Sequence, residues 1–268
     1  MNEETVLYAC EDGIATVTIN RPRAFNAINR EVVAAFNAIL DKLPESDPRV
    51  LILTGAGEKA FIAGADIEEM ENMDPIEAVD YSASCHRLLD RLSSLPIPVI
   101  AAVNGFALGG GLEFALACDV RISADNGVFG FPEVTLGIIP GWGGTQRLPR
   151  LIGQGRALEL LFTGKRIKAD EAASLGIVNQ IVPKGEALNG ALLFARGISR
   201  ARTAVANVKK AATMGLRCGL DTGLSLEAGC FGNCFAHPDQ KEGMAAFKEK
   251  REARFEEKSL KKKGCHVS

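Results

Sequence analysis

Polar and apolar positions change their spacing several times in the first half of the chain, and this predicts strands alternating with helices. Residues 13–22 (GIATVTINRP) alternate as a strand that stops at Pro22. Residues 49–55 (RVLILTG) and 97–105 (IPVIAAVNG) are apolar almost throughout, and residues 119–124 (DVRISA) continue as a strand. Strands of this kind predict an α/β fold with a mainly parallel sheet covered by helices.

Helical spacing fills the segments between these strands. Residues 29–43 repeat apolar side chains as one face of a helix, and residues 76–95 form a long helix ended by Pro96. From about residue 140 the chain becomes mostly helical, with a brief strand within residues 177–183. We therefore expect an α/β core over residues 1–195 and a helical C-terminal region over residues 196–268. The apolar face of the first helix consists of Val32, Val33, Phe36, Ile39, Leu40 and Leu43.

Composition limits the function classes that need to be considered. The 268 residues are 47% hydrophobic and 24% charged, with a formal net charge of −2, which gives no support for nucleic-acid binding through a basic face. The seven cysteines are scattered and odd in number, as is typical of reduced thiols. The first residues are acidic without an apolar stretch, and no window approaches 18 apolar residues. We expect a cytoplasmic protein without a membrane segment.

Two short motifs resemble cofactor-binding sites, but each lacks a necessary part. Residues 54–61 (TGAGEKAF) fit a dinucleotide-binding glycine pattern, but the amphipathic helix and the ribose-binding acid that should follow are missing. Cys230, Cys234 and His237 are either a fragment of a metal site or helix residues with small apolar side chains. No fourth metal ligand is evident, so neither a metal nor a dinucleotide cofactor is expected.

A glycine-rich turn follows the strand at residues 97–105. Residues 104–111 (NGFALGGG) lead into a helix predicted to begin near Gly110, and the unpaired N–H groups of a helix start attract negative charge. A second turn of small residues, 61–67 (FIAGADI), comes after the strand at residues 49–55. One N–H from each turn would make a two-donor hole for a carbonyl that becomes an enolate. The alternative is a tight strand-to-helix turn without a ligand.

Two glutamates stand in otherwise apolar segments, each after a glycine-rich turn. Glu113 lies in the first turn of the predicted helix, and Glu133 follows Pro132 in the segment FGFPEVTLGIIPG. Either one alone is explained by a carboxylate near a helix start. Because a buried charge is costly, the pair favours a catalytic acid and base.

Six ordered stretches of the chain resemble the enoyl-CoA hydratase (crotonase) family over nearly its full length. The resemblance implies a spiral of ββα repeats with a helical C-terminal trimerisation region, and homotrimers or dimers of trimers. The six stretches are INRPRAFNAIN, FIAGADIEEM, AAVNGFALGGGLEFALACD, FPEVTLGIIPGWGGTQRLPRLIG, LFTGKRIKADEAASLGIVNQIV and GMAAFKEKREARF.

The resemblance also assigns roles to residues of this sequence. It implies oxyanion donors at the N–H groups of Ala65 and Gly110, catalytic carboxylates at Glu113 and Glu133, and a water-positioning backbone at Gly141. The expected activity is reversible hydration of short-chain trans-2-enoyl-CoA to 3-hydroxyacyl-CoA, with coenzyme A as part of the substrate rather than a cofactor. Contacts to coenzyme A are implied at Ala24, Ala63, Asp66 and Ile67, and at Phe247 and Lys250 of a neighbouring subunit.

Trp142 departs from the family pattern, because many relatives have a smaller residue in the turn PGWGGTQ. It either lines the acyl pocket or packs as a core or subunit-contact aromatic. Two other functions remain possible on the same fold: an enoyl-CoA isomerase, and a non-catalytic RNA-binding relative using Lys209 and Lys210. The presence of both glutamates favours hydration over isomerisation, and the negative net charge argues against RNA binding.

Overall fold

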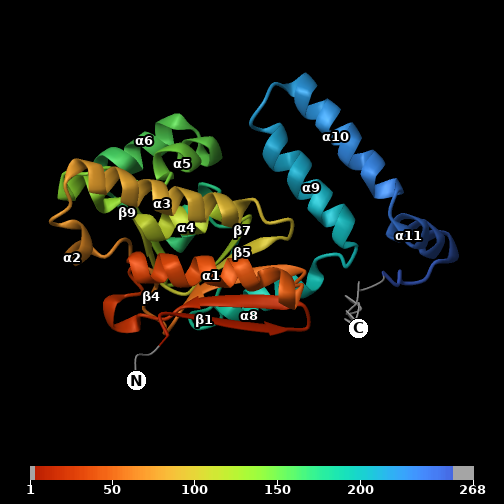
Figure 1. The fold of residues 1–268 in the computed structure, drawn as a ribbon, viewed down its shortest axis with the longest axis horizontal. Coiled ribbons are helices and arrows are strands. Elements are labelled where there is room, and N and C mark those ends of the chain that lie inside the picture. The colour runs from red at the N-terminus through yellow and green to blue at the C-terminus, as the bar shows by residue number, and fades with distance from the viewer. Residues whose placement is uncertain (1–3, 256–268) are drawn as a thin grey trace, which may run out of the picture. The chain divides into compact units, whose positions relative to one another are not determined.

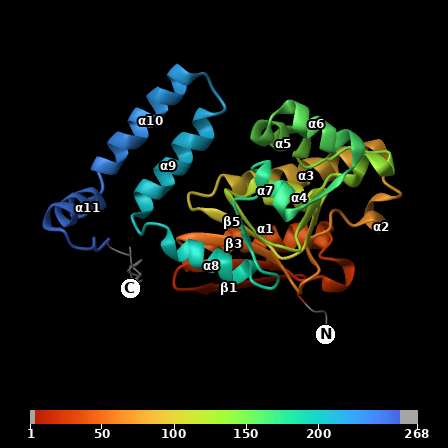
Figure 2. The same cartoon turned by 180° about the vertical axis from the view of Figure 1, so that it is seen from behind.

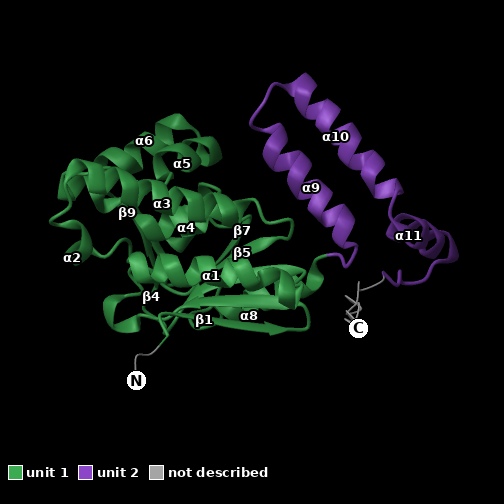
Figure 3. Ribbon diagram, viewed as in Figure 1, with its two compact units in different colours: residues 1–198 green, residues 199–268 purple. Residues whose placement is uncertain are grey.

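The computed structural model describes residues 4–255, shown from opposite sides in Figures 1 and 2. The chain divides into two compact units, residues 1–198 and residues 199–268 (Figure 3). The first unit contains both sheets and the helices α1 to α8, and the second unit is helical.

Two sheets form the framework of the first unit. The larger has the strand order β1-β2-β3-β5-β7-β10, with β1 antiparallel to β2 and the other neighbours parallel. The smaller has the order β4-β6-β8-β9, in which only β9 is antiparallel. The strands are β1 (Val6–Glu11), β2 (Ile14–Ile19), β3 (Val50–Gly55), β4 (Ala60–Ile62), β5 (Val99–Val103), β6 (Phe106–Leu108), β7 (Val120–Ala124), β8 (Val128–Gly130), β9 (Arg166–Lys168) and β10 (Gln180–Val182).

A ββα repeat connects the two sheets. In three successive repeats, the first strand (β3, β5 or β7) enters the larger sheet and the second (β4, β6 or β8) enters the smaller one. A helical segment follows each pair, which confirms the predicted spiral. The helical segments of the first unit are η1 (Pro22–Ala24), α1 (Arg30–Ser46), α2 (Ile67–Met70), α3 (Pro75–Ser93), α4 (Gly110–Ala117), η2 (Pro132–Leu136), α5 (Gly144–Ile152), α6 (Gln154–Thr163), α7 (Ala169–Ser174) and α8 (Ala187–Gly197).

Helices cover both faces of the larger sheet, as its apolar strands predict. Along β3, Leu51 and Leu53 join the main core beneath α1, α3 and α4, whereas Val50 and Ile52 pack with the alanines of α8. Figures 1 and 2 both place α8 across the sheet from α3 and α4. Because alternate residues of a strand point to opposite faces, a strand buried on both sides must be apolar throughout.

The start of the long helix α3 is fixed by local hydrogen bonds. Asp74 accepts hydrogen bonds from the backbone N–H groups of Ile76 and Glu77, and the Glu77 side chain accepts one from the N–H of Asp74. This capping box, with Pro75 in the first helical position, fixes the start of the helix. Its buried face then presents Tyr81, Cys85, Leu88, Leu89 and Leu92 to the core.

The second unit contains α9 (Arg202–Gly215), α10 (Leu220–Phe235) and α11 (Pro238–Glu249). Gly215 and Gly223 allow α9 and α10 to approach closely, since a Cβ on Gly223 would lie 3.4 Å from the Cα of Gly215. Large apolar side chains on these helices are exposed in the single chain, among them Leu220, Leu224 and Phe231. No helix in residues 4–255 has the length and apolar character needed to span a bilayer.

Candidate active site

Corresponding segments of three successive ββα repeats meet at one place. Ala65 follows β4, Gly110 follows β6 and Glu133 follows β8, and these three strands are parallel neighbours in the smaller sheet. The turns after β4 and β6 run side by side: a Cβ on Gly111 would come within 1.8 Å of the Ile62 carbonyl oxygen. The repeat therefore brings together residues that lie far apart in the sequence.

Two backbone N–H groups in these turns are unpaired. Gly110 is the first residue of α4, and Gly109 before it has a φ of 52°, which favours glycine. Ala65 forms an isolated parallel bridge with Ile28. Among the described residues, neither the Ala65 nor the Gly110 N–H donates to a protein acceptor. Such groups are able to bind an oxyanion.

Glu113 is buried but held by backbone donors. Only 1% of its surface is exposed, and its Oε1 accepts hydrogen bonds from the N–H groups of Trp142 (2.7 Å) and Gly144 (2.6 Å). Burial raises the pKa of Glu113 to about 7, although the two N–H donors and the Arg147 guanidinium oppose that rise. The carboxyl therefore changes charge near neutral pH.

Glu133 has a different environment. Its carboxylate lies against Gly109, where a Cβ would come within 2.4 Å of Oε1, and its Oε2 is buried without a hydrogen-bond partner among the described residues. Burial raises the pKa of Glu133 to about 7, and the negative charge of Glu113 adds to the rise, while its own backbone N–H opposes it. The charge of Glu113 thus contributes to the raised pKa of Glu133.

Trp142 packs between the oxyanion turn and α3. It is 4% exposed, and a Cβ on Gly110 would lie 2.1 Å from its Cζ3, so the indole lies directly against this glycine. Its ring meets those of Tyr81 and Phe114 edge to face, with centroids 5.7 and 6.1 Å apart. These contacts make Trp142 a buried core aromatic beside Gly110, and its place in an acyl pocket stays a prediction.

Gly141 lies at the start of the same turn. Its carbonyl accepts a hydrogen bond from the hydroxyl of Ser82 in α3. This contact ties the turn to α3 immediately before the Trp142 N–H that binds Glu113.

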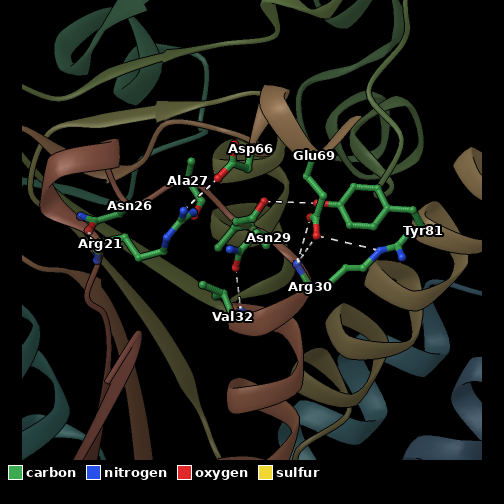
Figure 4. Close-up of polar contacts among 10 residues, drawn as sticks. Arg21, Asn26, Ala27, Asn29, Arg30, Val32, Asp66, Glu69 and Tyr81 are labelled. Carbon is green, nitrogen blue, oxygen red and sulfur yellow. Dashed lines mark hydrogen bonds and ion pairs between the residues drawn. The ribbon is translucent and has the colours of Figure 1, made fainter. Parts of the chain in front are cut away.

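The four coenzyme A positions expected in the first unit also lie together. Ala63 donates its N–H to the carbonyl of Phe25, the neighbour of Ala24, and Asp66 precedes Ile67 at the start of α2. The carboxylate of Asp66 forms an ion pair with Arg21 at 2.9 Å, as Figure 4 shows. A second pair joins Arg30 to Glu69, whose carboxylate also accepts the backbone N–H of Arg30.

The remaining two predicted contacts, Phe247 and Lys250, lie in the second unit. Phe247 is 85% exposed on α11, and Lys250 ends that helix with a φ of 53°. They belong to the second unit, whereas the other four expected positions belong to the first.

Three further residues at the site, Tyr81, Ser82 and Gly144, were not predicted from the sequence. Tyr81 and Ser82 belong to a helix whose spacing predicts only burial, and Gly144 is one of several glycines in its turn. Nothing in the sequence indicates that these residues reach Ile28, Gly141 and Glu113.

A metal centre is not formed by the residues that the structure describes, since no group of three His, Cys, Asp or Glu side chains is suitably arranged. Cys234 donates to the carbonyl of Cys230 within α10, and His237 caps α11 by accepting the N–H of Asp239. These contacts agree with the helical interpretation of the cysteine pair.

Two unpaired N–H donors beside two buried, interacting carboxyls define a class of enzyme that stabilises an oxyanion while it moves protons. Residues 9–258 match the family model described as enoyl-CoA hydratase/isomerase. The chain belongs to this family.

Relatives agree along almost the whole chain. It is 49% identical over 254 residues to a short-chain-enoyl-CoA hydratase of Clostridium acetobutylicum, covering 94% of this chain and 97% of the relative. It is 47% identical over 258 residues to a crotonyl-CoA hydratase of Syntrophomonas wolfei, covering 95% and 99%. The solved structure of an enoyl-CoA hydratase from Bacillus anthracis superposes with a TM-score of 0.90 at 41% identity, covering 94% of this chain and 98% of the other.

Proposed function

We propose that this protein catalyses the reversible hydration of short-chain trans-2-enoyl-CoA to 3-hydroxyacyl-CoA, without a metal or nucleotide cofactor. The observation that carries the proposal is the pair of buried carboxyls beside the two unpaired N–H groups. The relatives named as short-chain-enoyl-CoA and crotonyl-CoA hydratases support the choice of substrate.

The N–H groups of Ala65 and Gly110 bind the thioester carbonyl oxygen. Their hydrogen bonds to this oxygen become stronger as negative charge develops on it, and this stabilises the enolate-like transition state. Withdrawal of electrons toward the carbonyl also makes the β-carbon of the enoyl group electrophilic. Water then adds there, and a proton is delivered to the α-carbon.

The different surroundings of the two glutamates assign the acid and the base. Glu113 accepts two backbone hydrogen bonds and is near Arg147, so it favours the ionised form and removes a proton from the attacking water. Glu133, with its unpartnered Oε2 and a neighbouring negative charge, favours the protonated form and delivers the proton to the α-carbon. The roles reverse in dehydration.

Other parts of the site hold the substrate in place. The backbone around Ala24, Ala63, Asp66 and Ile67 binds coenzyme A, while the Asp66 carboxylate itself is engaged by Arg21. The Gly141 backbone helps to place the water. The exposed apolar side chains of the second unit favour a homotrimer or a dimer of trimers, in which Phe247 and Lys250 serve a neighbouring subunit.

Trp142 supports a short acyl chain. Its indole fills the space against Gly110 and is itself confined by Tyr81 and Phe114, so a long acyl chain has little room on that side. The presence of both carboxyls favours hydration over isomerisation on the same fold.

The test is a direct assay with crotonyl-CoA. Hydration removes the conjugated double bond, so the ultraviolet band of the enoyl thioester should disappear at the same rate with and without a chelator and without added nucleotide. Glu113→Gln is the matched variant, expected to lose about 10²–10⁴-fold in kcat because glutamine cannot accept the proton. An absolute requirement for metal or NAD, or an unchanged rate in a folded Glu113→Gln, would contradict the proposal.

A further inference from the structure

The hydroxyl of Tyr81 contacts Ile28, which pairs with the turn that carries the Ala65 N–H. Tyr81 is 5% exposed, and its hydroxyl donates to the carbonyl oxygen of Ile28 at 3.2 Å (Figure 4). The same carbonyl accepts the N–H of Asp66 at 2.8 Å, and the Ile28 N–H donates to the Gly64 carbonyl at 2.9 Å. Tyr81 therefore holds the Ile28 carbonyl, which accepts one of the two hydrogen bonds of the bridge between Ile28 and Ala65.

That bridge sets the direction of the Ala65 N–H. In an extended segment, successive backbone groups point alternately to the two sides. Gly64 and Asp66 direct their polar groups toward Ile28, so the N–H of Ala65 points away from it. A shift of the Ile28 carbonyl is transmitted through Asp66 to the neighbouring oxyanion donor.

The ring of the same side chain contacts Trp142, which in turn lies against Gly110. It meets the Trp142 indole edge to face at 76°, and this indole lies against Gly110, which carries the second donor. The backbone N–H of Trp142 also binds Glu113. One side chain of α3 thus contacts both Ile28, which pairs with Ala65, and Trp142, which packs on Gly110.

We propose that Tyr81 is a positioning residue that fixes the spacing between the Ala65 and Gly110 N–H donors. The inference rests on the proposed hydration reaction. Tyr81 does not touch the reacting atoms, and acts through Ile28 on one side and Trp142 on the other. Burial raises the pKa of its phenol far above the ordinary value, so the hydroxyl remains a hydrogen-bond donor at every pH at which the enzyme is assayed.

Tyr81→Phe isolates the hydroxyl from the ring. The ring contact with Trp142 is retained, and the Ile28 carbonyl keeps the Asp66 N–H as a partner, so no buried acceptor is left unpaired. The matched control is Tyr8→Phe, because Tyr8 is the other tyrosine of the chain. Tyr8 lies on the edge strand β1, remote in sequence from both turns. Its hydroxyl forms a hydrogen bond with Ser46 in α1.

Two measurements separate positioning from packing. The first is the kinetics of crotonyl-CoA hydration: kcat of Tyr81→Phe should fall about tenfold, with KM changed much less, because a displaced donor costs less than the 10²–10³-fold loss of a deleted one. The second is binding of acetoacetyl-CoA, whose enolate places negative charge on the thioester oxygen, compared with binding of free coenzyme A, which has no carbonyl. Affinity for acetoacetyl-CoA should fall by a similar factor, whereas affinity for coenzyme A should not change.

The outcomes distinguish this inference from the proposed reaction. A Tyr81→Phe enzyme with wild-type kcat, or one that loses affinity for coenzyme A and acetoacetyl-CoA equally, shows that Tyr81 only packs. A selective loss of acetoacetyl-CoA binding, absent in Tyr8→Phe, supports the inference. If the wild-type protein does not hydrate crotonyl-CoA, the proposed reaction is wrong, and the ratio of the two affinities still decides the role of Tyr81.

Discussion

Replacing Glu133 by glutamine should make the protein less active and more stable. Glutamine has nearly the same shape but delivers no proton, so kcat for crotonyl-CoA should fall about 10²–10⁴-fold. The same change removes a carboxyl that is 9% exposed, has an unpartnered Oε2 and lies near the charge of Glu113. Loss of function and gain of stability therefore come from the same group.

The gain follows from the pKa of Glu133, raised from 4.5 to about 7 by burial and by Glu113. At about 1.4 kcal/mol for each pH unit, ionising Glu133 in the folded protein costs up to about 3 kcal/mol more than in the unfolded chain. Between pH 4.5 and 7 the folded state binds more protons than the unfolded state, so wild-type stability falls as the pH rises through that window. Glu133→Gln should escape the part of this fall that comes from Glu133.

Urea unfolding at several pH values and a fixed protein concentration provides the assay. The stability advantage of Glu133→Gln over the wild type should be absent below pH 4.5 and largest above pH 7, and the exposed residue Glu45 supplies a control as Glu45→Gln. Glu113→Gln should show the same pH dependence, because burial also raises the pKa of Glu113 to about 7. A Glu133→Gln protein that is no more stable than the wild type at pH 8 would refute this reasoning.

Three further outcomes are expected. Gly110→Ala should lower kcat and the free energy of unfolding together, by about 1–3 kcal/mol for the latter, because its Cβ would overlap the Trp142 indole; unchanged kinetics would argue against the Gly110 donor. Trp142→Ala should raise the kcat/KM of long-chain relative to four-carbon enoyl-CoA, whereas an unchanged ratio with a lower melting temperature would mean that Trp142 only packs. The pH profile of kcat/KM should be bell-shaped around pH 7, since one glutamate must be ionised and the other protonated; a flat profile between pH 5 and 9 would contradict that pairing.

The main elements of the fold were predictable where they are long or fully apolar. The strands β2, β3, β5 and β7 and the helices α1 and α3 appear where the hydrophobic pattern places them. The edge strand β1 was missed because most of its residues are exposed, so it has no apolar face to detect. The strands of the smaller sheet were missed because each has only three residues and follows a longer strand or a glycine-containing turn, so no separate period is visible.

The candidate site was predictable only in part, for a related reason. Glu113 and Glu133 are conspicuous as isolated charges in apolar sequence, and the glycines at 109–111 indicate a close backbone approach. Tyr81 has no such local signal. Its importance comes from contacts with Ile28 and Trp142, which are separated from it by dozens of residues and meet it only after the repeats have folded.

The position of Trp142 gives the protein a built-in optical reporter. It is the only tryptophan among 268 residues, and it lies buried against Gly110 while its amide binds Glu113. Tryptophan emission from the whole molecule therefore originates at the candidate site, next to a carboxyl that changes charge near neutral pH. Fluorescence titration with an acyl-CoA can follow occupancy of this site in the unmodified protein, without a label and without turnover.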